Sequence, residues 1–141
     1  MANQPGTWVF QDGPITFQCA SAVPKGALVM PDSTTPSQVK VATAGAVNVL
    51  GVAMKAGAPA GDATAHTATN RAGFGDKVPV ALSGVVRVTF ASSANPGDML
   101  VAAANGQVTK YTSGGTSTFD QIVGTAMEVV SSGAVGAMEI E

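Results

Sequence analysis

Charged side chains, aromatic rings and long apolar runs are all scarce in this 141-residue chain. Asp, Glu, Lys and Arg make up 11% of the residues and leave a net charge of −2. The seven Lys and Arg are scattered rather than clustered, so we expect no direct binding to nucleic acid. No apolar run approaches the roughly 20 residues that a membrane-spanning helix needs. The first residues lack the basic and apolar regions of a secretory signal, so we expect no membrane partner either.

Cysteine is nearly absent as well. Cys19 is the only one, which excludes an intrachain disulfide and fits a protein that folds in a reducing cytosol. It alternates with Ile15 and Phe17 on one face of an expected strand. No neighbouring residue indicates a lowered pKa, so we expect Cys19 to be a buried structural thiol rather than a reactive one.

Residue patterns that support catalysis or metal binding are equally scarce. His66 is the only histidine, and no metal-ligand spacing surrounds it. The serines lack the Gly-x-Ser-x-Gly pattern of a nucleophile elbow, and the aspartates stand mostly at expected turns, where they bond the backbone. We therefore expect no enzyme, no cofactor and no metal. A small hydrolase is the least favoured interpretation, and His66→Ala would abolish the activity of one that uses a histidine base.

Small and β-branched residues are what the chain has in abundance. Gly, Ala, Val, Ser and Thr dominate, which is typical of strand-rich proteins with tight turns. Apolar and polar side chains alternate with a period of two, which is typical of half-buried strands. The alternating segments are 15–20, 39–41, 78–82 and 86–90. Helix is weakly supported: 42–52 could form a short one, but Gly45 and Gly51 oppose a long one, so we expect at most one or two helical turns.

Turn signals separate these segments. The strongest is Asn105-Gly106, which lies between two short apolar stretches and predicts a hairpin. Further Pro, Gly, Asn and Asp clusters stand at 24–26, 32–36, 95–98 and 113–116.

The sequence also repeats itself. Segments 15–17, 24–29 and 48–54 recur in order as 88–90, 95–101 and 121–127, with a weaker match of 78–82 to 137–140. The offsets are 73 residues from Ile15 to Val88, 71 from Gly26 to Gly97 and 73 from Gly51 to Gly124. Each half would be marginally stable alone. We therefore predict a single all-β domain over 14–141, a small barrel or sandwich built from two related halves, about 14–84 and 85–141.

Two segments fall outside the repeat. Residues 1–13 carry Trp8 and Phe10 among Pro and Gly residues and are predicted to be an extended arm. Residues 56–75 predict one long loop, with Arg71 and Phe74, that the second half lacks. Aromatic residues and Arg are enriched in interfaces, so these four residues are the predicted partner-binding residues. The alternative for the arm is that it folds back and caps the open end of its own barrel.

The order of several short segments resembles one protein family. These segments are Pro-Lys-Gly-Ala-Leu-Val at 24–29, Val-Leu-Gly-Val-Ala at 49–53, the alternating stretch 75–85, and Asn-Pro-Gly-Asp-Met-Leu-Val at 95–101. In this respect the chain resembles the small β-barrel decoration, or cement, proteins of tailed-bacteriophage capsids. The resemblance covers about residues 14–130, and neither the arm nor the loop at 56–74 matches the family pattern.

The resemblance implies a non-enzymatic virion protein that is made in the host cytoplasm and binds the outer surface of the assembled capsid. Its partners would be the major capsid protein and other copies of itself, often as a homotrimer, and its role would be capsid stabilisation against the pressure of packaged DNA. The alternative is a glycan- or receptor-binding module of a virion, such as a head-fibre or tail-associated domain. That alternative would need exposed aromatics at a sugar platform, and Trp8 and Tyr111 are far apart in sequence.

Overall fold

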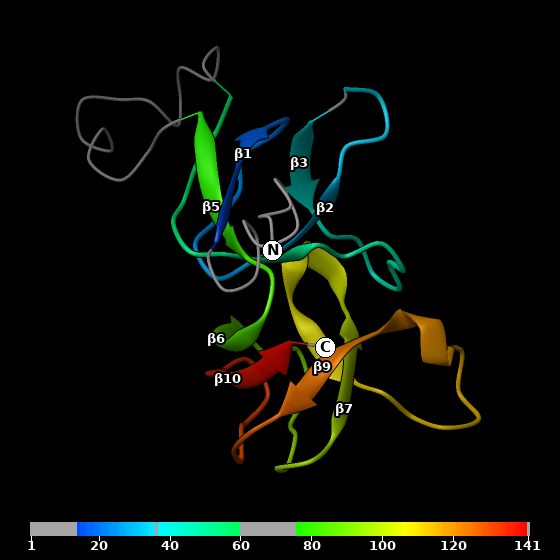
Figure 1. The fold of residues 1–141 in the computed structure, drawn as a ribbon. Helices are drawn as coiled ribbons and strands as arrows, with labels where there is room; N and C mark the ends of the chain where they lie inside the picture. Colours follow the sequence, from blue (N-terminus) through cyan, green and yellow to red (C-terminus); the bar gives the residue numbers. More distant parts are fainter. Residues whose placement is uncertain (1–13, 36, 60–75, 141) are drawn as a thin grey trace, which may run out of the picture.

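The computed structural model describes residues 14–35, 37–59 and 76–140, and these residues form an all-β protein. Ten β-strands fall into two groups of five, which lie one above the other in Figure 1. The described residues hold no α-helix; two 3₁₀ turns, at Ala104–Gly106 and Phe119–Gln121, are their helical content. The predicted all-β class is confirmed.

The first five strands close into a barrel, called the first barrel below. Their order around it is β1-β3-β2-β4-β5, with β1 parallel to β3 and every other pair antiparallel. The strands are β1 (Ile15–Cys19), β2 (Leu28–Pro31), β3 (Gln38–Val41), β4 (Gly51–Ala53) and β5 (Lys77–Ala81).

The last five strands form the second sheet, in the order β6-β10-β9-β7-β8. They are β6 (Gly84–Thr89), β7 (Met99–Ala102), β8 (Val108–Lys110), β9 (Ile122–Ala126) and β10 (Val135–Ile140). A parallel bridge between Phe90 and Val108 joins the two outer strands of this sheet. The second sheet therefore has the same strand order and directions as the first barrel, with one bridge in place of the β1–β3 ladder.

Hydrogen bonds at corresponding turns show how closely the two halves agree. The Gly26 N–H donates to the Ala53 carbonyl at 2.8 Å, and the Gly97 N–H donates to the Ala126 carbonyl at 2.8 Å. Both glycines have positive φ, +82° and +90°, which residues with a side chain rarely adopt. The sequence match between 24–29 and 95–101 thus marks one turn that is built twice.

The first strand pair corrects the register of the sequence repeat. The Cys19 N–H donates to the Asp76 carbonyl, and the equivalent bond runs from the Phe90 N–H to the Ala134 carbonyl. Cys19 therefore corresponds to Phe90, 71 residues later, whereas pairing Ile15 with Val88 assumed 73. The alternation of side chains cannot reveal this two-residue offset, because a slip of two residues keeps every side chain on the same face of a strand.

The interior of the first barrel is filled by small side chains, and the second sheet encloses larger ones. The first cluster holds Cys19, Val23, Ala27, Val29, Val39, Ala53, Val78 and Val80. The second is centred on Phe90, Leu100, Val108 and Met138, all of them completely buried. Cys19 is 2% exposed, and burial, followed by the charge of Asp76, raises the pKa of its thiol. The prediction of a buried structural cysteine is confirmed.

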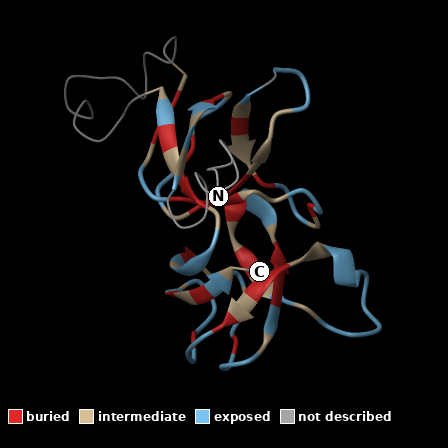
Figure 2. Ribbon diagram, in the orientation of Figure 1, coloured by how far each residue is buried: buried red, intermediate tan, exposed pale blue. Residues whose placement is uncertain are grey.

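The two halves are joined by one face of the first barrel. Leu28 on β2 stands opposite Val52 on β4, which stands opposite Ala81 on β5, and the three are at most 8% exposed. Leu28 and Val52, together with Ala42 and Ala46, belong to the same buried cluster as the interior of the second sheet. Figure 2 shows buried residues within both groups of strands and where they meet. The division of the chain into an arm and a single domain stays a prediction.

The structure contains the hairpin predicted from the sequence but not the short helix considered for 42–52. Asn105 and Gly106 both have positive φ, +62° and +71°, and connect the antiparallel strands β7 and β8, so the predicted hairpin is confirmed. The helix considered for 42–52 is absent; these residues form turns that lead into β4. Within the residues that the structure describes, no helix is long and apolar enough to cross a membrane.

The carboxylates of two turn aspartates have pKa values lowered by their hydrogen bonds. The carboxylate of Asp98 accepts the Asn95 N–H at 2.8 Å and lies 3.4 Å from Lys110 Nζ, and these two contacts lower its pKa below the ordinary 3.8. The hydroxyl of Thr34, at 2.8 Å, and two backbone N–H groups likewise lower the pKa of Asp32. A carboxyl whose pKa is lower when folded stabilises the fold above its unfolded pKa, and this contribution is lost as the pH falls through the folded pKa.

We therefore expect the melting temperature to fall as the pH is lowered below about 4, the ordinary pKa of aspartate. Asp98→Asn should lower the melting temperature at pH 7 and weaken this pH dependence. Thermal unfolding followed by circular dichroism between pH 2.5 and 7 would measure both effects. An unchanged pH profile in Asp98→Asn would show that this carboxylate does not contribute.

Candidate partner-binding surface

All four partner-binding residues predicted from the sequence lie outside the described residues. Trp8 and Phe10 belong to 1–13, and Arg71 and Phe74 to 60–75. They stay predictions, as do the extended arm and most of the long loop. The candidate surface is therefore built from the described parts of the chain.

A tight turn brings the two halves together at the surface. Residues 24–27 turn back at Gly26, where the Ala27 N–H donates to the Pro24 carbonyl. A Cβ on Gly26 would lie 3.4 Å from the carbonyl oxygen of Arg87 on β6. This close approach places the side chain of Lys25 beside β6, which belongs to the other half of the chain.

A groove lies at this junction. It has a volume of about 350 Å³ and is lined from the first barrel by Lys25, Gly26, Val52, Ala53 and Met54, and from the second sheet by Val85, Val86, Arg87 and Ala137. A second hollow of about 270 Å³ shares Lys25, Gly26 and Arg87 and continues to Thr89 and Val135. The two hollows, which adjoin at these three residues, are together called the junction groove below.

The junction groove exposes apolar side chains because of the alternation of β6. Val86 and Val88 point into the second sheet and pack against or within its buried cluster, so Val85 and Arg87 point outward. Val85 is 59% exposed, and Met54 at the other side of the groove is 48% exposed. Exposed apolar groups that adjoin one another, with charged groups at their rim, are typical of protein interaction sites.

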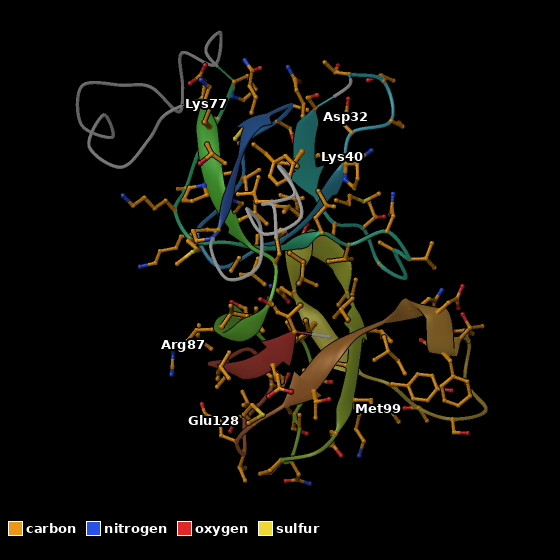
Figure 3. All side chains as sticks on the ribbon, viewed as in Figure 1. Asp32, Lys40, Lys77, Arg87, Met99 and Glu128 are labelled. Atoms are coloured by element: carbon orange, nitrogen blue, oxygen red, sulfur yellow. The ribbon has the colours of Figure 1, made fainter. Side chains whose placement is uncertain are left out.

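The two charged residues that line the groove, Lys25 and Arg87, are both cationic. Arg87 Nη2 lies 3.9 Å from Glu128 Oε1, with both side chains largely exposed, so this ion pair holds Arg87 weakly. Within the described parts of the chain, Lys25 and Lys77 have no carboxylate within 4.0 Å. Figure 3 shows Lys77 and Arg87 on the same side of the molecule, one on each half. This side can therefore accept carboxylates from a partner.

An aromatic pair stands apart from this groove. The rings of Tyr111 and Phe119 have centroids 5.4 Å apart and are tilted by 32°, and Phe119 is 72% exposed. A 3₁₀ turn holds Phe119: the Thr118 N–H donates to Gln121 Oε1 at 3.0 Å, and the Thr118 hydroxyl bonds the Asp120 carboxylate. The pairing of Tyr111 with Phe119 is not evident from the sequence, because Phe119 follows eight residues later in a polar stretch without strand alternation.

Titratable side chains do not converge elsewhere in what the structure describes. Among residues 14–35, 37–59 and 76–140, no three His, Cys, Asp or Glu side chains lie close enough together to hold a metal ion.

Comparisons with known proteins give a match in fold. No protein-family model matches the chain, and no curated protein matches it. Among solved structures, the chain is similar to the head fiber gp8.5 N base in bacteriophage phi29, with a TM-score of 0.63 and 16% sequence identity. The match covers 93% of this chain and 95% of that chain, so it includes both halves. The double five-stranded arrangement is thus a fold that a second protein adopts with a very different sequence.

Proposed function

We propose that this chain is a structural protein of a bacteriophage virion, a decoration protein that binds the outer surface of the assembled head and stabilises it. The observation that supports a structural role in the virion is the fold shared over nearly the whole of both chains with the head fiber base of phage phi29. The segment order that resembles capsid decoration proteins supports the same location. The partners in this proposal are the major capsid protein and further copies of the chain, as a homotrimer on the shell, and no catalytic step is assigned to it.

Weak contacts are sufficient for such a role. A shell presents the same site many times, so a modest interface on each copy adds up to a large stabilisation across the lattice. The junction groove offers such an interface, because it combines exposed Met54 and Val85 with the cationic Lys25 and Arg87.

Co-sedimentation tests the proposal directly. The purified chain is mixed with unexpanded and with expanded heads of the phage that encodes it, and the copies bound per capsid subunit are counted. We expect saturable binding at a fixed ratio, stronger on expanded heads, and a higher temperature for DNA release from decorated heads. Absence of binding to both kinds of head would refute the proposal.

The base of a head fibre is the second candidate, and the phi29 comparison favours it. Such a base would bind heads without raising the temperature of DNA release, so the release assay separates the two functions. Electron microscopy of heads from the complete phage would then show fibres at the positions that the chain occupies.

A glycan-binding module is a variant of this second candidate, and the Tyr111–Phe119 pair favours it, because adjacent exposed rings can stack on a sugar. Phe119→Ala should change the free energy of unfolding by less than about 0.5 kcal/mol, as for most exposed positions. If the wild-type chain binds sugars on a glycan array, the same variant should lose that binding. A cement protein should bind no sugar on the array.

A further inference from the structure

We propose that the junction groove binds an extended, acidic segment of the shell protein, with apolar side chains of that segment against Met54 and Val85 and its carboxylates against Lys25 and Arg87. This inference rests on the proposed function for the identity of the partner. The groove itself is defined by the described residues alone.

The shape of the groove suits an extended chain. The two hollows share Lys25, Gly26 and Arg87 and follow β6 from Val85 to Thr89. An elongated trough receives a run of successive side chains, whereas a compact ligand would fill only one of the hollows.

The charges of the groove determine the sign of its occupant. Lys25 and Arg87 flank the apolar floor, although the chain as a whole carries a net charge of −2. The negative groups beside the groove are Glu128, 3.9 Å from Arg87, and Glu139, opposite Val85 on the outer side of β10. The exposed contact with Glu128 contributes little, so a carboxylate that is partly shielded from water in the groove can replace it.

The apolar residues of the groove, called its floor, supply the part of the affinity for the segment that the charges do not. Met54 is unbranched and flexible, so its side chain can adapt to different apolar partners. Val52, which is buried, and Ala137, which is half-buried, also line the groove. A purely ionic ligand would leave this floor exposed, which is why we infer a segment that mixes acidic and apolar residues.

Charge reversal in the groove is the test. Lys25→Glu combined with Arg87→Glu should reduce the affinity of the chain for expanded heads at least tenfold. Lys40→Glu combined with Lys110→Glu is the matched control, because it makes the same change in net charge at lysines paired with Asp32 and Asp98 outside the groove. Affinity in the control should change less than threefold. Binding by the wild-type chain should weaken from 50 to 300 mM NaCl, and the groove variant should lose much of that salt dependence.

Each outcome has a defined meaning. Heads that bind the wild-type chain and the groove variant equally would overturn the groove assignment and leave the proposed function intact, whereas failure of the wild-type chain to bind would remove both. Met54→Glu, which alters the floor without altering the turn, should also weaken binding, and circular dichroism would verify that each variant is folded. A photo-crosslinking residue at position 54 should join the chain to an acidic segment of a shell protein. Crosslinking to a second copy of this chain would contradict the inference.

Discussion

Alanine at Gly51 should destabilise the protein by at least about 3 kcal/mol, the upper part of the range for forcing atoms into a packed interior. A Cβ at this position of β4 would overlap the carbonyl oxygen of Ala81 on β5 and crowd a methyl group of Val80. The obstacle at Ala81 is backbone, so no rotation of a side chain can relieve it. Gly124 is the equivalent residue of β9, and its Cβ would overlap the carbonyl oxygen of Glu139 on β10. We expect Gly124→Ala to be similarly damaging.

Urea unfolding followed by circular dichroism would measure both losses. Gly114→Ala is the control: its φ is +82°, and a Cβ there would meet no atom within 4 Å. The control should lose only about 1–2 kcal/mol, the cost of a left-handed backbone at a residue with a side chain. If Gly51→Ala lost no more than Gly114→Ala, the close approach of β4 and β5 would not limit stability. Because total stability is typically about 5–15 kcal/mol, either test variant can leave the protein partly unfolded.

Removing the ring of Phe90 should cost about 3–5 kcal/mol, the usual range for a buried phenylalanine replaced by alanine. Phe90 is completely buried, and one edge of its ring would lie 3.2 Å from a Cβ on Gly136. Its backbone also forms the bridge to Val108 that joins the outer strands of the second sheet. We therefore expect Phe90→Ala to lower both the urea midpoint and the protection of the β6 and β8 amides from hydrogen exchange.

The repeat supplies a matched comparison. Cys19 occupies the position of Phe90 in the first barrel, and Cys19→Ala removes one buried sulfur, so we expect a loss of about 1 kcal/mol. If Cys19→Ala and Phe90→Ala lost the same free energy of unfolding, the interior of the second sheet would not depend on its large side chain more than the first barrel depends on its small one. A smaller decrease in the amide protection of β1 in Cys19→Ala than of β6 in Phe90→Ala would agree with the expected difference in stability.

Much of the fold was predictable from local signals. Alternation placed the strands now seen as β1, β3, β5 and β6, and Asn105-Gly106 placed the β7–β8 hairpin, because both signals act within a few residues. The duplicated turns at Gly26 and Gly97 were visible as repeated sequence for the same reason. The offset of the first strand was misjudged by two residues, since alternation is unchanged by a slip of that length.

The candidate site was much less predictable. Lys25, Met54 and Arg87 are separated by about thirty residues each, and only the packing of one half on the other brings them to one groove. The partner-binding residues predicted from the sequence are aromatic residues and an arginine in segments without strand pattern, which lie outside the described residues. Met54 is not among them, because a methionine at the end of a strand is an ordinary core residue until its exposure is known.

The faces that correspond to one another in the two halves differ in polarity. Leu28 and Val52 pack with the interior of the second sheet, and buried Ala81 stands in the same row. Their equivalents in the second sheet are Met99, Thr125 and Glu139, which also stand opposite one another in one row. A contact between unlike faces of similar units can add further units without limit. Glu139 is exposed where the first barrel has buried Ala81, and covering its charge would carry a large desolvation cost. We therefore expect that a third unit does not add through the row that contains Glu139.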